Sequence, residues 1–187
     1  SWAHTGRGLW LDDIQREKTA RRWREHLGDK ILICGVGSRD GSTEAEIVDE
    51  AVSMAKAAKE CGADAVLAFP PSKLQGQQRQ KAIVRYHEAL VEVGLPVIAF
   101  YLYEQAGGLL YDDETLTAIL SLDGVVGLKS ATLDSVMRFQ EIAQLMESFP
   151  TKALLTGEDR MFGYSLMRGA TGALVGLGAV ETELQLK

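Results

Sequence analysis

Short apolar runs recur along the chain, each bounded by glycine or proline and rich in valine, isoleucine, leucine and alanine. They lack the in-and-out alternation of a half-exposed strand, and continuous apolar runs are typical of strands covered on both faces, as in parallel sheets. We therefore predict six strands, at Lys30–Val36, Ala65–Phe69, Pro96–Leu102, Gly124–Leu128, Lys152–Leu155 and Gly172–Leu177.

Helical periodicity fills the intervals between these runs. After Thr43 the apolar residues follow helical spacing, and Thr43 with Glu46 predicts a capping box. A second stripe from Val136 to Met146 predicts another amphipathic helix. Weaker patterns predict helices at Leu11–Leu27, Gln77–Val93, Asp113–Leu120 and Arg160–Arg168. A weak repeat, in which glycine ends a helix and an apolar strand follows, occurs at Gly62–Leu67, Asp123–Leu128 and Gly169–Leu174.

Strands that alternate with helices indicate βα units joined by right-handed crossovers. Two architectures fit, an open doubly wound sheet and a closed barrel. The glycines at 35, 37 and 41 lack the Gly-x-Gly-x-x-Gly spacing, so a dinucleotide-binding fold loses support. We predict one domain over residues 1–187, an incomplete (β/α)₈ (TIM) barrel that lacks its first strand or strands and its C-terminal helices, since a complete barrel takes about 250 residues.

Composition narrows the class of protein. The 187 residues are 46% hydrophobic and 25% charged, with a net charge of −6, which suits a soluble globular domain. No run approaches the roughly 20 apolar residues of a membrane helix. The basic residues are scattered, and those within Arg16–Arg24 fit the solvated face of an outer helix, so we expect neither a nucleic-acid nor a membrane partner.

The cysteines and histidines exclude two further classes of site. Cys34 and Cys61 form no framework of paired spacings, which favours a reduced, cytoplasmic protein over a disulfide scaffold. The three histidines, His4, His26 and His87, are isolated and give no metal-ligand spacing. His26 and His87 fall in predicted outer helices, and we expect both at the surface.

Six short motifs, in order along nearly the whole chain, carry a family resemblance. They are Ala3–Arg7, Cys34–Ser38, Leu95–Tyr101, Gly127–Ala131, Leu155–Asp159 and Gly169–Gly178. The chain resembles the dihydrodipicolinate synthase / N-acetylneuraminate lyase family of class I aldolase barrels, whose corresponding segments include Gly-Thr-Thr-Gly-Glu, Ala-Gly-Thr-Gly-Ser, Leu-Pro-Val-Ile-Leu-Tyr-Asn and Gly-Ile-Lys-Glu-Ala. Each motif alone is short, and the ordered set predicts the barrel.

Lys129 is the first candidate for chemistry. It follows a run too apolar for a surface strand and lies at the C-terminal end of that strand, the face where barrel enzymes keep their chemistry. A lysine there is either a solvated or ion-paired side chain or a partly desolvated amine of lowered pKa. The resemblance implies the second, with Lys129 as the residue that forms a Schiff base with a ketone.

Several positions depart from the family pattern. The resemblance implies a tyrosine general acid–base at the end of the fifth strand, and Phe100 stands there. Tyr101 points to the opposite face by strand alternation. Tyr103 is either a replacement catalytic residue or a structural aromatic. Ser72 matches the family's second tyrosine, and Gln105 stands where the synthases carry an arginine for the aldehyde substrate's carboxylate, which argues against authentic dihydrodipicolinate synthase activity.

The resemblance also suggests substrate contacts. Thr5 matches a threonine that binds the keto-acid carboxylate, or else it caps a turn. His4 replaces the neighbouring hydroxyl and is either a substrate contact or a loop histidine, and we expect Gln105, Gly157 and Leu174 to line the same site. The meaning of Arg7, which replaces an acidic family residue, stays open.

Two glycine segments carry alternative interpretations. The Gly107-Gly108 loop either approaches substrate, as in the family, or serves only as a turn, and Gly176–Gly178 is a phosphate cradle only if the substrate bears phosphate. We predict a Schiff-base lyase or hydro-lyase for a small 2-keto acid, without a dissociable cofactor and as a homo-oligomer (tetramer or dimer). The alternative is a barrel that kept the fold and binds or senses keto acids.

Overall fold

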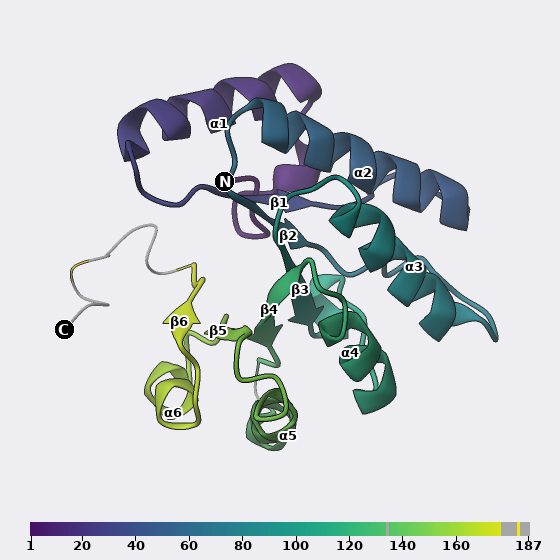
Figure 1. The fold of residues 1–187 in the computed structure, drawn as a ribbon, viewed down its shortest axis with the longest axis vertical. Coiled ribbons are helices and arrows are strands. Elements are labelled where there is room, and N and C mark those ends of the chain that lie inside the picture. Colours follow the sequence, from purple (N-terminus) through teal and green to yellow (C-terminus); the bar gives the residue numbers. More distant parts are fainter. Residues whose placement is uncertain (134, 177–182, 184–187) are drawn as a thin grey trace.

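A single parallel sheet organises the computed structural model, which describes residues 1–133, 135–176 and 183 (Figure 1). Its strands occur in chain order, and each pairs in parallel with the next. They are β1 (Ile33–Val36), β2 (Ala65–Ala68), β3 (Val97–Leu102), β4 (Val125–Ala131), β5 (Ala153–Thr156) and β6 (Gly172–Ala173).

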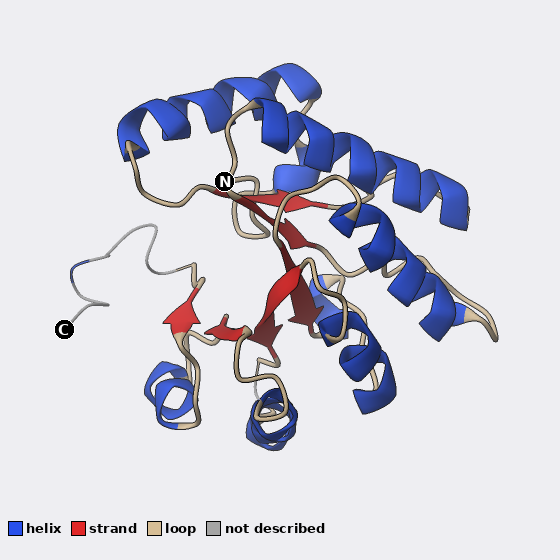
Figure 2. Ribbon diagram, viewed as in Figure 1, coloured by secondary structure: helices blue, strands red, loops and turns tan. Residues whose placement is uncertain are grey.

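The strand order decides between the two predicted architectures. A doubly wound sheet reverses its order at a switch point, and the six described strands show no reversal. The sheet curves, and the helices line its convex side (Figure 2). The described strands therefore wind as in a TIM barrel, and the complete eight-stranded barrel remains an expectation.

The helices agree with the predicted pattern to within about two residues at each end. They are α1 (Asp13–Leu27), α2 (Glu44–Glu60), α3 (Arg79–Val91), α4 (Asp113–Leu120), α5 (Val136–Met146) and α6 (Phe162–Met167), with short 3₁₀ turns η1 (Gly8–Trp10) and η2 (Glu104–Ala106). The predicted capping box of α2 is confirmed: Thr43 Oγ1 accepts from the Glu46 amide at 3.2 Å and Glu46 Oε2 accepts from the Thr43 amide at 3.1 Å. Such capping hydrogen bonds satisfy backbone amides at the first turn and so favour the start of the helix at that residue.

Side chains on the two faces of the sheet form two separate hydrophobic layers. The larger layer lies between strands and helices, and the smaller one faces the concave interior and contains Phe69, Phe100 and Leu102. The predicted alternation is confirmed at Tyr101, which belongs to the outer layer and whose hydroxyl accepts from Arg138 Nε at 3.3 Å. The position that the family resemblance assigns to a catalytic tyrosine therefore faces the interior as a phenyl ring.

The N-terminal segment lies close to both edges of the described sheet. Ser1 lies beside β1, where its carbonyl accepts from the Gly35 amide at 2.9 Å. At the other edge, a Cβ placed on Gly176, just past β6, would lie 3.3 Å from Thr5 Oγ1. The segment before β1 and the segment after β6 thus meet across the mouth, which is the arrangement expected when a sheet curves toward closure.

Three predictions need revision. Strand β4 extends to Ala131, so Lys129 lies within the strand and not after it. Strand β6 is shorter than predicted, and Leu177 and Gly178 lie outside the described residues. His87 is not at the surface but fully buried, because α3 packs against α4 as well as the sheet. Its ring touches Tyr86 and Tyr111 edge-on.

The structure also bears on the cysteines, on membrane-spanning helices and on clusters of metal ligands. Cys34 and Cys61 are both free and buried. Within the described residues no helix is long and apolar enough to cross a membrane. The same residues contain no cluster of three or more potential metal ligands from histidine, cysteine or acidic side chains.

Candidate active site

Lys129 lies on the concave face of the sheet, near the carboxyl end of β4, where the sequence predicts the chemistry. On β4 it stands in register with Phe100 of β3 and Leu155 of β5. Its side chain is 8% exposed, and Nζ lies 4.3 Å from the centroid of the Phe100 ring. No ion pair of the described residues involves it. The amine therefore packs against the Phe100 ring and forms no ion pair with a described residue.

Burial changes the acidity of this amine. Desolvation lowers the pKa of Lys129 to about 8, and the negative charges of Asp159 and Glu158 partly oppose the shift. A lysine of ordinary pKa is almost wholly protonated near neutrality, whereas this one supplies a substantial neutral fraction. A neutral amine is the form that attacks a carbonyl carbon.

Gly157, the residue after β5, makes room for the lysine. Its amide donates to the Ser130 carbonyl at 2.7 Å, which brings its backbone against β4. A Cβ at this position would lie 2.9 Å from Lys129 Cε and 3.1 Å from the Ala131 Cβ. A side chain here would therefore push on the lysine, so the glycine is required by the close approach of its backbone.

Glu158 is a buried residue that the sequence analysis did not single out. It is 2% exposed, and its carboxylate accepts from the Thr132 amide, from Thr132 Oγ1 at 2.9 Å and from the Leu133 amide at 3.1 Å. Burial raises the pKa of Glu158, and these hydrogen bonds act against the rise. The carboxylate ties the segment after β4 to the segment after β5, one residue beyond Gly157.

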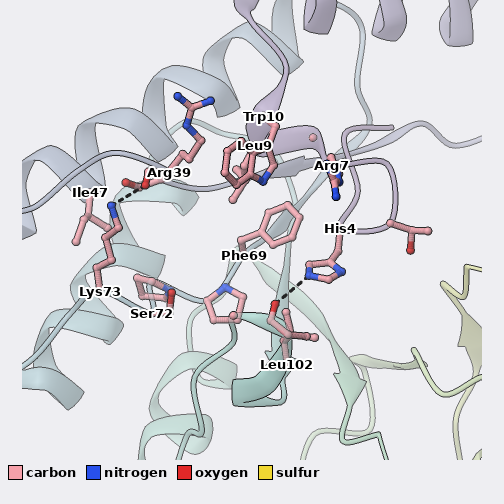
Figure 3. Close-up of a pocket in the computed structure, with 17 residues that line it drawn as sticks. His4, Arg7, Leu9, Trp10, Arg39, Ile47, Phe69, Ser72, Lys73 and Leu102 are labelled. Carbon is pink, nitrogen blue, oxygen red and sulfur yellow. Dashed lines mark hydrogen bonds between the residues drawn. The ribbon is translucent and has the colours of Figure 1, made fainter.

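A cavity of about 620 Å³ opens over the carboxyl ends of β1, β2 and β3, and His4 and Thr5 line it (Figure 3). His4 Nε2 is 3.0 Å from the Ala106 carbonyl, and its ring lies 6.2 Å from that of Phe69. Thr5 is exposed to the same space. Two of the predicted substrate contacts are thus brought together here, and Ala106 and Gly107 line the same cavity.

Other candidate residues are distributed around this mouth. Tyr103 is half-buried, packs against the interior layer, and lines a second cavity of about 760 Å³ together with Gln105 on η2. Leu174 follows β6, where its amide donates to the Thr156 carbonyl at 2.9 Å. The structure thus groups Lys129 with Gly157, His4 with Thr5, and Tyr103 with Gln105, and their roles remain predictions.

Comparison with known proteins adds the family. The sequence profile of the dihydrodipicolinate synthetase family matches residues 2–179. The chain belongs to this family. An uncharacterized DapA-like lyase from Chloroflexus aurantiacus is 26% identical over 185 residues, which cover 96% of this chain and 58% of the relative.

Solved structures of the dihydrodipicolinate synthetase family share the fold. YagE, a dihydrodipicolinic acid synthase family protein from E. coli K12 in complex with pyruvate, gives a TM-score of 0.81 at 22% identity over 98% of this chain and 59% of that one. N-acetylneuraminate lyase from Mycoplasma synoviae gives 0.77 at 22% identity over 97% and 57%. The chain therefore spans less than two thirds of the length of these relatives and carries the corresponding part of their fold.

Proposed function

We propose that this protein is a class I aldolase-type lyase or hydro-lyase that acts on a small 2-keto acid through a Schiff base at Lys129. The observation that carries the proposal is the environment of Lys129, a buried interior amine whose pKa is lowered to about 8 and which no carboxylate neutralises in an ion pair of the described residues. Family membership and the pyruvate complex of YagE support the same chemistry.

The reaction follows from the amine. Neutral Nζ adds to the keto carbon, the carbinolamine loses water, and a protonated imine forms. The imine then accepts an electron pair, either from a C–C bond that breaks while the hydroxyl of the departing fragment gives up its proton and that fragment leaves as a carbonyl compound, or from a C–H bond whose proton is lost so that a hydroxyl group on the next carbon leaves as water. Protonation of the resulting enamine and hydrolysis of the imine return the free lysine and the keto acid. No dissociable cofactor is needed, because the imine itself is the electron sink.

The proton carrier is the part of the reaction in which this chain departs from the family resemblance. Phe100 has no acidic hydrogen, so Tyr103, a substrate hydroxyl or water carries the proton in this proposal. Thr5, His4 and backbone amides at the mouth bind the carboxylate. A homo-oligomeric state and a cytoplasmic location accompany the proposal as expectations.

A second function is favoured by Phe100 itself. A phenyl ring packed 4.3 Å from the amine leaves the site without the hydroxyl expected there, which suits a barrel that binds or senses a keto acid reversibly. Ser72 and Gln105 point the same way, since both replace residues that the family resemblance assigns to catalysis or substrate binding.

Borohydride trapping tests the proposal. The protein is incubated with pyruvate and a panel of other 2-keto acids, reduced, digested and analysed by mass spectrometry. We expect a reduced adduct at Lys129 and none in Lys129→Ala. An absence of adduct with every keto acid contradicts the lyase, and adduct formation without turnover of any substrate favours the sensing protein.

A further inference from the structure

The cavity beside His4 and Thr5 is unusually cationic for this chain. Three basic residues, Arg7, Arg39 and Lys73, line it, and among the described residues no aspartate or glutamate does. The chain as a whole carries a net charge of −6, so this lining opposes the overall charge. A concave site walled by one sign of charge concentrates counter-charged ligands. The cavity is therefore built to attract an anion.

Two of these cations have polar or aromatic partners beside the cavity. Glu50 accepts from the Arg39 amide at 3.1 Å and so fixes the loop after β1, and Lys73 Nζ donates to the Arg39 carbonyl at 2.6 Å. The Arg39 guanidinium lies 5.2 Å from the centroid of the Trp10 ring. Its ion pair with Asp40, at 3.0 Å, is solvent-exposed and hence weak, which leaves the guanidinium able to bind a ligand.

Arg7 is the third cation. It precedes η1 in a left-handed backbone conformation (φ 50°), and its guanidinium makes no hydrogen bond or ion pair that involves described residues. Figure 3 shows Arg7 and His4 on one side of the Phe69 ring and Lys73 with Ser72 on the other. Cationic and hydroxyl donors thus surround an aromatic wall.

That wall connects the cavity to the candidate nucleophile. The rings of Phe69 and Phe100 have centroids 5.9 Å apart, and Phe100 in turn carries Lys129 Nζ over its face. Phe69 lines the cavity, and both rings belong to the interior layer. A chain of buried aromatic contacts therefore links the amine to Phe69 in the cavity wall.

We propose that this cavity binds the distal anionic group, a carboxylate or a phosphate, of an extended 2-keto acid whose keto end reacts at Lys129. The apolar middle of that substrate lies against Phe69 in the cavity wall. The inference rests on the proposed function and names its substrate class, a dianionic keto acid.

The charge distribution around the mouth explains the choice. Gln105, which stands at the carboxylate-binding position implied by the family resemblance, is neutral and lines a different cavity. Positive charge is placed instead on the loops after β1 and β2 and before η1. Arginine pairs bidentately with carboxylate and phosphate, and the Ser72 hydroxyl supplies a further donor. Recognition of the second acidic group is thus assigned to Arg7, Arg39 and Lys73.

A matched pair of keto acids tests the assignment on the intact protein. 2-Oxohexanoate and 2-oxoadipate have the same chain length and differ in the terminal carboxylate, and 2-oxo-5-phosphonopentanoate replaces that group by a phosphonate. The half-saturating concentration for borohydride trapping is measured for each at low ionic strength. We expect at least about a tenfold lower value for one or both dianions, since charge-assisted hydrogen bonds are involved. The better of the two identifies carboxylate or phosphate as the group bound.

Variants locate the effect. Arg7→Gln with Lys73→Gln should remove most of the dianion preference, whereas Lys18→Gln with Arg22→Gln, an equal loss of two charges on exposed positions of α1, should retain it. Equal trapping of dianion and monoanion by the wild type overturns the inference while the proposed function stands, as does a preference that survives the double substitution of Arg7 and Lys73. If no keto acid is trapped, the proposed function fails first. Calorimetric binding of 2-oxoadipate that is lost in the same double variant then still supports the anion site, and no such binding overturns it.

Discussion

The Nζ atom of Lys129 lies 4.3 Å from the centroid of the Phe100 ring, and the two residues stand in register on the neighbouring strands β4 and β3. The ring removes water from the amine and gives it no hydrogen bond in return. A protonated amine over an aromatic face recovers part of the lost hydration energy, but less than a carboxylate partner would provide. Burial of the amine lowers the pKa of Lys129, and the ring beside it has no hydroxyl to carry a proton.

The pH dependence of Schiff-base trapping should report this environment. Because only the neutral amine attacks and the pKa of Lys129 is about 8, initial trapping of pyruvate should rise between pH 7 and about 9 and then level off. Reaction at the exposed Lys81 is the internal control in the same digest. Trapping at Lys129 that keeps rising steeply above pH 10 would mean that the amine is not desolvated.

Replacing the amine by an apolar group should stabilise the fold near neutrality. The folded state lowers the pKa of Lys129 from 10.5 to about 8, so the unfolded chain binds the extra proton between those values. This penalty is complete below pH 8 and disappears as the pH rises toward 10.5. Urea unfolding of Lys129→Met at pH 7 should show a gain on the order of 2–3 kcal/mol. A gain that persists unchanged at pH 10.5 would have another origin, such as packing.

Gly157→Ala should impair trapping without removing the nucleophile. The new Cβ would lie 2.9 Å from Lys129 Cε, closer than such atoms approach, so the lysine must move. We expect at least about a tenfold fall in the trapping rate, since small displacements of reacting groups are costly. Gly163→Ala is the matched control, because a Cβ at Gly163 meets nothing within 4 Å. Equal rates in the two variants would show that Gly157 does not position the amine.

Phe100→Tyr should supply the hydroxyl that the family resemblance expects. The side chain is 1% exposed and already touches Lys129, so a phenol there is within reach of the reacting atoms. Turnover of the keto acid that is trapped best should rise by about tenfold or more. Tyr101→Phe, on the opposite face of the same strand, controls for changes in strand packing. Unchanged turnover alongside intact trapping would place the proton carrier elsewhere.

His87 should make the fold sensitive to acid. Burial lowers the pKa of His87 from 6.5 to about 4, so in that interval the unfolded chain binds a proton that the folded chain excludes. Stability should therefore fall as the pH drops from 6.5 to 4, by on the order of 3 kcal/mol for this group. Chemical unfolding of His87→Phe across that range should lack this part of the slope. A slope equal to that of the wild type would assign the acid sensitivity to other groups.

The architecture was largely predictable because its signals are local. Unalternating apolar runs indicated buried parallel strands, and the capping box at Thr43 fixed the start of α2. The position of Lys129 on an interior strand could be inferred from the run before it. The strand order that excluded the doubly wound alternative is a property of pairing between distant segments, and no local pattern encodes it.

The errors and omissions concern contacts between elements. His87 looked like a surface residue because its burial depends on the packing of α3 against α4, which the periodicity of one helix does not reveal. Glu158 was overlooked as a site residue because its partners are backbone amides of Thr132 and Leu133, groups that every sequence possesses. Gln105 lines a different cavity from His4 and Thr5, and no pattern in the sequence indicated that separation.

The two sides of the mouth differ in rigidity, because the buried carboxylate of Glu158 stabilises only one of them. After β4 and β5 the buried Glu158 carboxylate accepts hydrogen bonds from the backbone amides of Thr132 and Leu133. Buried hydrogen bonds of this kind break only when the surrounding core unfolds locally. After β1 and β2 the loops are joined by solvent-exposed hydrogen bonds, such as the one from Lys73 to the Arg39 carbonyl. Water readily replaces such hydrogen bonds. A ligand would therefore contact a rigid region around Lys129 and a more adjustable region formed by the loops after β1 and β2. Variation among substrates should therefore be accommodated over β1 and β2 while the geometry at the nucleophile stays constant.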